Sequence, residues 1–245
     1  MEERGTPLVE MRNIHKWFGK VHAVNGVNFK IWPGEVVGLV GDNGAGKSTL
    51  IKILTGYHRA DEGEIFFEGK KVRINSPRDA RKLKIETVYQ ERALVDLIDI
   101  MRNVFLGREP TNRLGFLNKK LMKEKSLSIL KDMGLSIKDP DVEVRFLSGG
   151  EKQGVAIARA IHFKAKLVIL DEPTIALSVK EVKKVLDFVR KIKKQGVAVI
   201  FITHNLYHVY PIADRFYVMA RGKIVKEFKK GEATIEELAE AIAAA

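Results

Sequence analysis

The run Gly41-Asp42-Asn43-Gly44-Ala45-Gly46-Lys47-Ser48-Thr49 constrains the fold of this chain more than any other segment. It has the pattern G-x-x-x-x-G-K-[ST], which is typical of a phosphate-binding loop. An apolar run, Glu35 to Val40, precedes it, and apolar residues at helical spacing follow it from Leu50. Strand, glycine-rich loop and helix in this order bring backbone N–H groups and the positive end of a helix to one phosphate group. The sequence therefore predicts an α/β fold that binds a nucleoside triphosphate.

Two side chains of the loop have the chemistry that a triphosphate requires. Lys47 supplies a positive charge for the β- and γ-phosphates, and the Ser48 hydroxyl is a ligand for Mg²⁺. The alternative interpretation, a chance glycine-rich turn, is disfavoured because the strand and the helix are both in place. Kinases, GTPases, helicases and transport ATPases share this loop, so the rest of the chain has to distinguish among them.

A second glycine-rich segment, Leu147-Ser148-Gly149-Gly150-Glu151-Lys152-Gln153, opens another helix. Ser148 and Glu151 have the spacing of a capping box at the helix N-terminus. The two glycines that follow the cap are expected to expose backbone N–H groups, which would form a second site for an anion. A chain with one nucleotide needs two such sites only if the second serves a neighbouring molecule.

Acidic residues end the next apolar strand, Leu167 to Leu170. Asp171 and Glu172 follow directly, at the carboxyl end of a strand where ligands bind in open α/β sheets. Asp171 suits a contact to Mg²⁺. Glu172 suits a general base or a residue that positions water.

These motifs, in this order and with His204 downstream, resemble the ATPase cassette of an ABC transporter over nearly the whole chain. The resemblance implies an α/β fold: a P-loop NTPase, RecA-like core with an N-terminal antiparallel β subdomain and an inserted α-helical subdomain. It divides the chain into an ATP-binding core with the β subdomain (1–90 and 147–233), a helical subdomain (91–146) and a short C-terminal helix (234–245). ATP and Mg²⁺ are the expected cofactors.

The resemblance also assigns further site residues. Phe18 falls where the family places an aromatic ring that stacks on adenine, with Trp17 as the competing candidate. Gln90 matches the glutamine that contacts Mg²⁺ and the attacking water, in a loop that faces the membrane subunits. His204 matches the histidine that contacts the γ-phosphate. Ser178 departs from the pattern, because an aspartate is common there, and this puts aspartate-mediated communication between two sites in doubt.

A cassette of this family works with partners. The resemblance implies a head-to-tail dimer in which Ser148, Gly149, Gly150 and Glu151 act on the nucleotide of the other copy. It implies transmembrane permease subunits, an extracytoplasmic solute-binding protein as an indirect partner, and a peripheral position on the cytoplasmic face of the cell membrane. Segments 56–58, 76–80, 88–91, 103–109 and 147–153 resemble ribose- and fructose-type import cassettes, so sugar import is expected.

Three alternatives differ in function. An importer of another small solute, such as a nucleoside or an amino acid, remains open because the cassette does not contact the solute. A soluble ABC ATPase acting on DNA or ribosomes is disfavoured, because residues 91–146 hold no sustained heptads and the chain has one cassette. A small-molecule kinase is disfavoured by the signature at Ser148 and by His204.

Composition is consistent with this interpretation. The chain has no cysteine, a polar start and no apolar run near the ~20 residues that span a bilayer, so a membrane is expected to be reached through partners. The formal net charge is +12, with many lysines on solvent faces of amphipathic helices. A solvated lysine-rich surface is favoured over a functional basic patch, attraction to an anionic leaflet is a third interpretation, and no nucleic-acid partner is expected.

Overall fold

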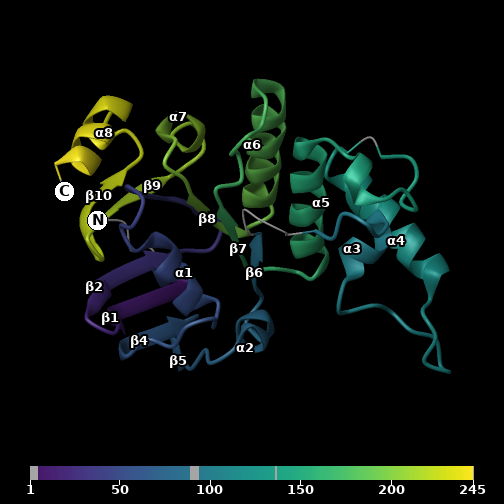
Figure 1. The fold of residues 1–245 in the computed structure, drawn as a ribbon, viewed down its shortest axis with the longest axis horizontal. Helices are drawn as coiled ribbons and strands as arrows, with labels where there is room; N and C mark the ends of the chain where they lie inside the picture. The colour runs from purple at the N-terminus through teal and green to yellow at the C-terminus, as the bar shows by residue number, and fades with distance from the viewer. Residues whose placement is uncertain (1–4, 89–93, 136, 245) are drawn as a thin grey trace.

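The computed structural model describes residues 5–88, 94–135 and 137–244. Two sheets form its centre (Figure 1). The first is antiparallel, with the order β2-β1-β4-β5. Its strands are β1 (Val9–Phe18), β2 (Val21–Ile31), β4 (Glu62–Phe67) and β5 (Lys70–Val72).

The second sheet has six strands in the order β10-β9-β3-β8-β7-β6. All its pairs are parallel except the terminal hairpin of β9 and β10. Its strands are β3 (Val36–Val40), β6 (Ile85–Val88), β7 (Leu167–Asp171), β8 (Ala198–Ile202), β9 (Arg215–Ala220) and β10 (Lys223–Lys229). Every residue of β3 and β8 is buried, as expected of strands covered on both faces.

Helices cover both faces of the six-stranded sheet. The described helices are α1 (Lys47–Leu54), α2 (Pro77–Lys82), α3 (Ile100–Phe105), α4 (Lys119–Asp132), the short 3₁₀ helix η1 (Val144–Phe146), α5 (Gly149–His162), α6 (Val179–Lys194), α7 (Leu206–Val209) and α8 (Ile235–Ala243). Figure 1 shows α3 and α4 beyond α5, away from the sheets. The chain is thus α/β with an antiparallel sheet at its N-terminal end and helices between β6 and α5, as the sequence predicts.

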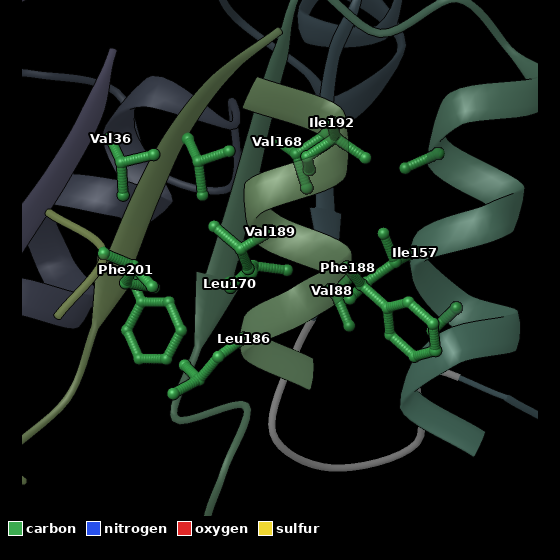
Figure 2. Packing of buried hydrophobic residues seen from close by; sticks show 14 of the residues in the cluster. Val36, Val88, Ile157, Val168, Leu170, Leu186, Phe188, Val189, Ile192 and Phe201 are labelled. Atoms are coloured by element: carbon green, nitrogen blue, oxygen red, sulfur yellow. The ribbon is translucent and has the colours of Figure 1, made fainter. Parts of the chain in front are cut away.

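Alternation along the strands divides the buried residues between two cores. Val168 and Leu170 of β7 join α5 and α6 on one face, whereas Leu167 and Ile169 join α1 and the antiparallel sheet on the other. Figure 2 shows the first core, where Val189 and Ile192 of α6 lie near the sheet and Ile157 of α5 lies beside Phe188 of α6. The period of two along β7 therefore holds the phosphate-binding helix and the signature helix on opposite faces of one sheet.

A buried arginine, Arg215, joins the two sheets and forms an ion pair with Glu35, just before β3. The Arg215 guanidinium of β9 donates to the Glu35 carboxylate (3.0 and 2.9 Å) and to the backbone oxygen of Lys30 at the end of β2 (2.8 Å). It also donates to the Tyr217 hydroxyl (2.8 Å), and burial raises the pKa of Tyr217 to about 12. Arg215 is only 4% exposed, so these bonds form the polar seam of an apolar interior.

The predicted capping box at Ser148 is confirmed at the start of α5, and Thr234 forms another at the start of α8. Gly154 permits close packing, because a Cβ there would lie 2.8 Å from both Leu135 and Phe188. Across residues 5–88, 94–135 and 137–244, no helix has the length and apolar character needed to cross a bilayer.

Candidate functional site

The loop between β3 and α1 runs through a passage that only glycine fits. Gly41 and Gly46 have φ of 145° and 101°. A Cβ at Gly41 would lie 2.1 Å from the Met219 oxygen, and one at Gly46 would lie 2.5 Å from the Ala23 oxygen. The loop is therefore held between the end of β9 and the start of β2, and its glycines are required by space as well as by conformation.

Lys47 begins α1 and turns back into the loop. Its Nζ donates to the backbone oxygens of Gly41 (2.7 Å) and Asp42 (2.8 Å). Burial lowers the pKa of Lys47, while the charges of Glu172 and Asp171 act in the opposite direction. The loop thus fixes an ammonium group at its centre, where the sequence predicts the phosphates.

A pocket of about 460 Å³ opens over this loop. The phosphate-binding loop and the carboxylates at the end of β7 meet in this pocket, because β3 and β7 are parallel strands whose carboxyl ends lie at the same edge of one sheet. Asn43, Gly44, Ala45, Gly46, Lys47, Ser48 and Thr49 line it, with Asp171, Glu172 and Ile202 opposite and with Val21, His22, Ala23, Arg221 and Gly222 at the side.

The oxygen donors in this pocket fit Mg²⁺ bound together with a phosphate. Ser48 and Asp171 line the same pocket, and burial, followed by the neighbouring Glu172, raises the pKa of Asp171. A bound dication would stabilise the charged form of this carboxylate and so offset the effects of burial and of Glu172. In the described part of the chain, no three His, Cys, Asp or Glu residues could together hold a metal ion. This agrees with Mg²⁺, which takes one or two protein oxygens and leaves the rest to phosphate and water.

Glu172 is held in an unusual conformation. Its φ is 49°, a region that costs a non-glycine residue about 1–3 kcal/mol and is found at functional sites. Its Oε1 accepts from the His204 backbone N–H (3.1 Å) and pairs with His204 Nδ1 (2.8 Å), and its Oε2 accepts from the Thr203 hydroxyl (3.1 Å). His204 follows β8, so two neighbouring strand ends orient one carboxylate.

The aromatic candidates differ in their surroundings. The Trp17 ring stacks with His22 and His15, at centroid distances of 4.2 and 5.3 Å. Phe18 is 44% exposed and makes an edge contact with His58 (5.1 Å). Neither Phe18 nor Trp17 is among the residues that line the pocket. Phe18 is the more exposed of the two aromatic residues, and Lys16 Nζ lies 5.5 Å from its ring centroid.

The signature segment lies at the start of α5, and none of its residues lines the pocket of its own chain. Ser148 caps the helix by accepting from the Glu151 N–H, while the Glu151 carboxylate accepts from the Ser148 N–H. The expectation that both glycine N–H groups are exposed is wrong for one of them. The Gly150 N–H donates to Glu181 Oε1 at 3.1 Å. A Cβ at Gly149 would lie 2.6 Å from Leu177, so this glycine allows close packing.

Ser178 has a local structural role. It is the N-cap of α6 and forms a capping box with Glu181, a role that an aspartate could also fill. Glu181 accepts from Gly150 N, Ser178 N and the Ser178 hydroxyl, and these bonds, led by the one from Gly150, lower its pKa to about 2. One carboxylate therefore joins the starts of α5 and α6.

Other residues complete the comparison with the sequence. Gln90 lies outside the described residues. Arg221 and Gly222 belong to no motif in the sequence, yet both line the pocket, and Arg221 has a φ of 46°. The sequence signal that could have identified Arg221 as a site residue is a cation in a turn between two strands. His22 and its neighbours in β2 carried no motif.

A phosphate-binding loop and a strand-end carboxylate pair sharing one pocket define a P-loop nucleoside triphosphatase. The family model described as "ABC transporter" matches residues 24–175. The chain belongs to the ABC transporter family and is one of its ATP-binding cassettes.

Relatives and solved structures agree. The chain is 54% identical to the xylose/arabinose import ATP-binding protein XylG of Sulfolobus acidocaldarius, over 95% of this chain and 92% of that protein. It is 42% identical to the ribose import ATP-binding protein RbsA 1 of Agrobacterium fabrum, over 90% of this chain but 43% of that protein. A cassette solved in its ADP conformation is similar, with a TM-score of 0.84, 28% identity and coverage of 98% and 96%. A dimeric post-hydrolysis cassette bound to ADP and Pi has a TM-score of 0.76, 26% identity and coverage of 91% and 98%. The RecA-like P-loop fold predicted from the sequence is thereby confirmed.

Proposed function

We propose that this chain hydrolyses ATP at two composite sites between two copies, and that it drives sugar import through a permease. One observation carries the composite site. Lys47, Asp171 and Glu172 line one pocket, whereas Ser148 and the two glycines after it lie elsewhere in the same chain. Because the start of α5 lies outside the pocket of its own chain, we infer that it contacts the nucleotide held in the pocket of another copy, although Glu181 already accepts from the Gly150 N–H.

Each group of the proposed site has a defined task. The loop N–H groups and Lys47 bind the phosphates, Phe18 stacks on the base, and Ser48, Asp171 and Gln90 would hold Mg²⁺, which would offset negative charge on the phosphates. Glu172 takes a proton from water, and His204 orients Glu172 through Nδ1 (2.8 Å). Oε1 of Glu172 already accepts two hydrogen bonds, whereas Oε2 accepts one, from the Thr203 hydroxyl, so Oε2 has more acceptor capacity left for water.

The remaining elements of the proposal follow from the relatives and the fold. Two relatives of high identity are named as sugar import ATP-binding proteins, for xylose/arabinose and for ribose. A cassette with this function works at the cytoplasmic face of a membrane, beside permease subunits that receive solute from a binding protein. The helices within residues 91–146 form the subdomain that contacts the permease and moves with it. ATP closes the dimer by binding the closed state more tightly than the open one.

A mixed dimer tests the composite site. One copy carries Lys47→Ala and the other carries Ser148→Arg, with different affinity tags so that only mixed dimers are purified. Shared sites leave one pocket with both Lys47 and a partner's Ser148 intact, so about half of the wild-type nucleotide trapping should remain. If each chain used its own Ser148, both pockets would be damaged.

The result is judged against dimers in which both copies carry the same change. These should trap no nucleotide. Complete loss of trapping in the mixed dimer would refute the shared site. Transport of xylose, arabinose and ribose by the reconstituted cassette and permease tests the substrate separately, and failure with every sugar would refute the import of sugars while leaving the ATPase intact.

A further inference from the structure

The loop between α3 and α4 projects from the helical part of the molecule (Figure 1). Its tip exposes two large apolar side chains, Leu114 at 81% and Phe116 at 69%. Leu117 beside them is also exposed. Single exposed apolar residues are ordinary on protein surfaces, but three within four positions at the end of a projection form a patch.

The patch is held outward by an ordered turn. Asn112 Oδ1 accepts from the backbone N–H groups of Leu114 (2.9 Å) and Phe116 (3.0 Å). The Asn112 N–H donates to the Phe116 oxygen (2.8 Å), and the Gly115 N–H donates to the Asn112 oxygen (3.0 Å). These bonds stabilise a conformation that keeps the two apolar side chains in water instead of folding them back onto the protein.

Three cations flank the patch along the chain, in a stretch bordered by Glu109 and Glu124. Arg113 directly precedes the apolar residues, and Lys119 and Lys120 follow them at the start of α4; all three are exposed. No Asp or Glu occurs from Pro110 to Lys123. Within the described residues, none of these three cations has an ion pair, so their charge is available to an external anionic surface.

We propose that this tip, residues 110–120, docks on an anionic lipid surface, with Leu114 and Phe116 inserted at the level of the headgroups. A rigid apolar point flanked by Lys and Arg has the chemistry of an interfacial membrane contact. A protein partner fits less well, because two or three side chains bury far less than the ~800 Å² per partner of a stable interface. Cytoplasmic loops of membrane proteins are themselves rich in Lys and Arg and would repel this tip.

Vesicle binding by the purified cassette tests the apolar contact. The probe is a vesicle of phosphatidylglycerol and phosphatidylcholine in equal parts, compared with phosphatidylcholine alone, in co-sedimentation at low salt. We expect binding to the anionic vesicle only, and a loss of at least about tenfold in the Leu114→Ser, Phe116→Ser double variant. The matched control is Leu97→Ser with Val225→Ser, which removes two exposed apolar side chains elsewhere and should bind like the wild type.

A second pair of variants tests the charges. Replacing Arg113, Lys119 and Lys120 by Gln should weaken binding by about a hundredfold, since each cation near an anionic surface contributes about fivefold. The control replaces Lys184, Lys191 and Lys194 of α6 by Gln, which changes the net charge equally and should have little effect. Phe116→Trp adds a direct readout, because its emission should shift to the blue only with anionic vesicles.

Every outcome decides the proposal. It is overturned if the wild type ignores anionic vesicles, if the double variant binds as the wild type does, or if the controls lose as much. Binding only to vesicles that contain a permease would assign the tip to a protein instead. ATP hydrolysis in solution should be equal in all variants, so failure here is distinguishable from failure of the proposed ATPase function.

Discussion

Replacing Glu172 by Gln separates chemistry from binding because the surroundings of this side chain accept an amide. Oε1 accepts two bonds from His204, at 3.1 and 2.8 Å, so the amide oxygen of Gln must take this position. The amide nitrogen then faces the Thr203 hydroxyl, which can rotate from donor to acceptor. All three contacts survive the exchange, and the pocket keeps its shape while losing its base.

The loss of the base sets the size of the effect. General-base catalysis typically contributes a hundredfold or more, so hydrolysis should slow by at least about 100-fold, or ~2.7 kcal/mol in the barrier. ATP affinity should be unchanged or higher, because Lys47 and the loop are untouched and one negative charge near the γ-phosphate is removed. The closed dimer should therefore accumulate.

Single-turnover hydrolysis and size exclusion at matched protein concentration measure the two effects. We expect the apparent mass to double with ATP but not with ADP. Glu236→Gln in the first turn of α8 is the control, since it removes a similar charge far from the pocket and should behave as the wild type. A Glu172→Gln protein that hydrolyses ATP normally and stays monomeric with ATP would show that Glu172 is not the base.

Four further variants test separate parts of the structure. Lys47→Ala should abolish ATP binding in calorimetry while circular dichroism shows an intact fold. Gly154→Val places atoms within 2.8 Å of two packed side chains. It should lower the free energy of unfolding, measured by urea denaturation, by about 1–3 kcal/mol. Arg215→Met leaves a buried carboxylate without its guanidinium and should cost about 3–5 kcal/mol in the same assay. The pKa of Glu181 is lowered from 4.5 to about 2, so its contribution to the free energy of unfolding is complete above pH 4.5 and is lost as the pH falls toward 2. In Glu181→Gln the urea midpoint should therefore depend less on pH over that range.

Features that depend only on residues close together in the sequence were predictable. The phosphate-binding loop, the capping box at Ser148 and the buried strand before Asp171 follow from spacing alone, because glycine conformation, helix ends and strand periodicity act over a few residues. The reason for Gly154 inside α5 could not be predicted, because its packing partners Leu135 and Phe188 come from other segments.

Contacts across the fold could not be predicted. Glu181 is part of an ordinary capping box in the sequence, and only the packing of α6 on α5 brings it to the Gly150 N–H. Arg221 and His22 line the pocket because β9, β3 and β2 meet there. Such positions depend on the order of strands in two sheets, which residue spacing does not encode.

The seam between the two sheets has a consequence for behaviour on heating. The free-energy penalty for dehydrating ions falls as temperature rises, so the Arg215–Glu35 pair becomes more favourable on heating. The stabilisation from apolar contacts reaches a plateau over the same range. The end of β2 and the start of β9 should then stay joined while the loop-connected helices α3 and α4 open first. Amide hydrogen exchange followed through a temperature series would register this as protection that persists longest at the end of β2 and the start of β9.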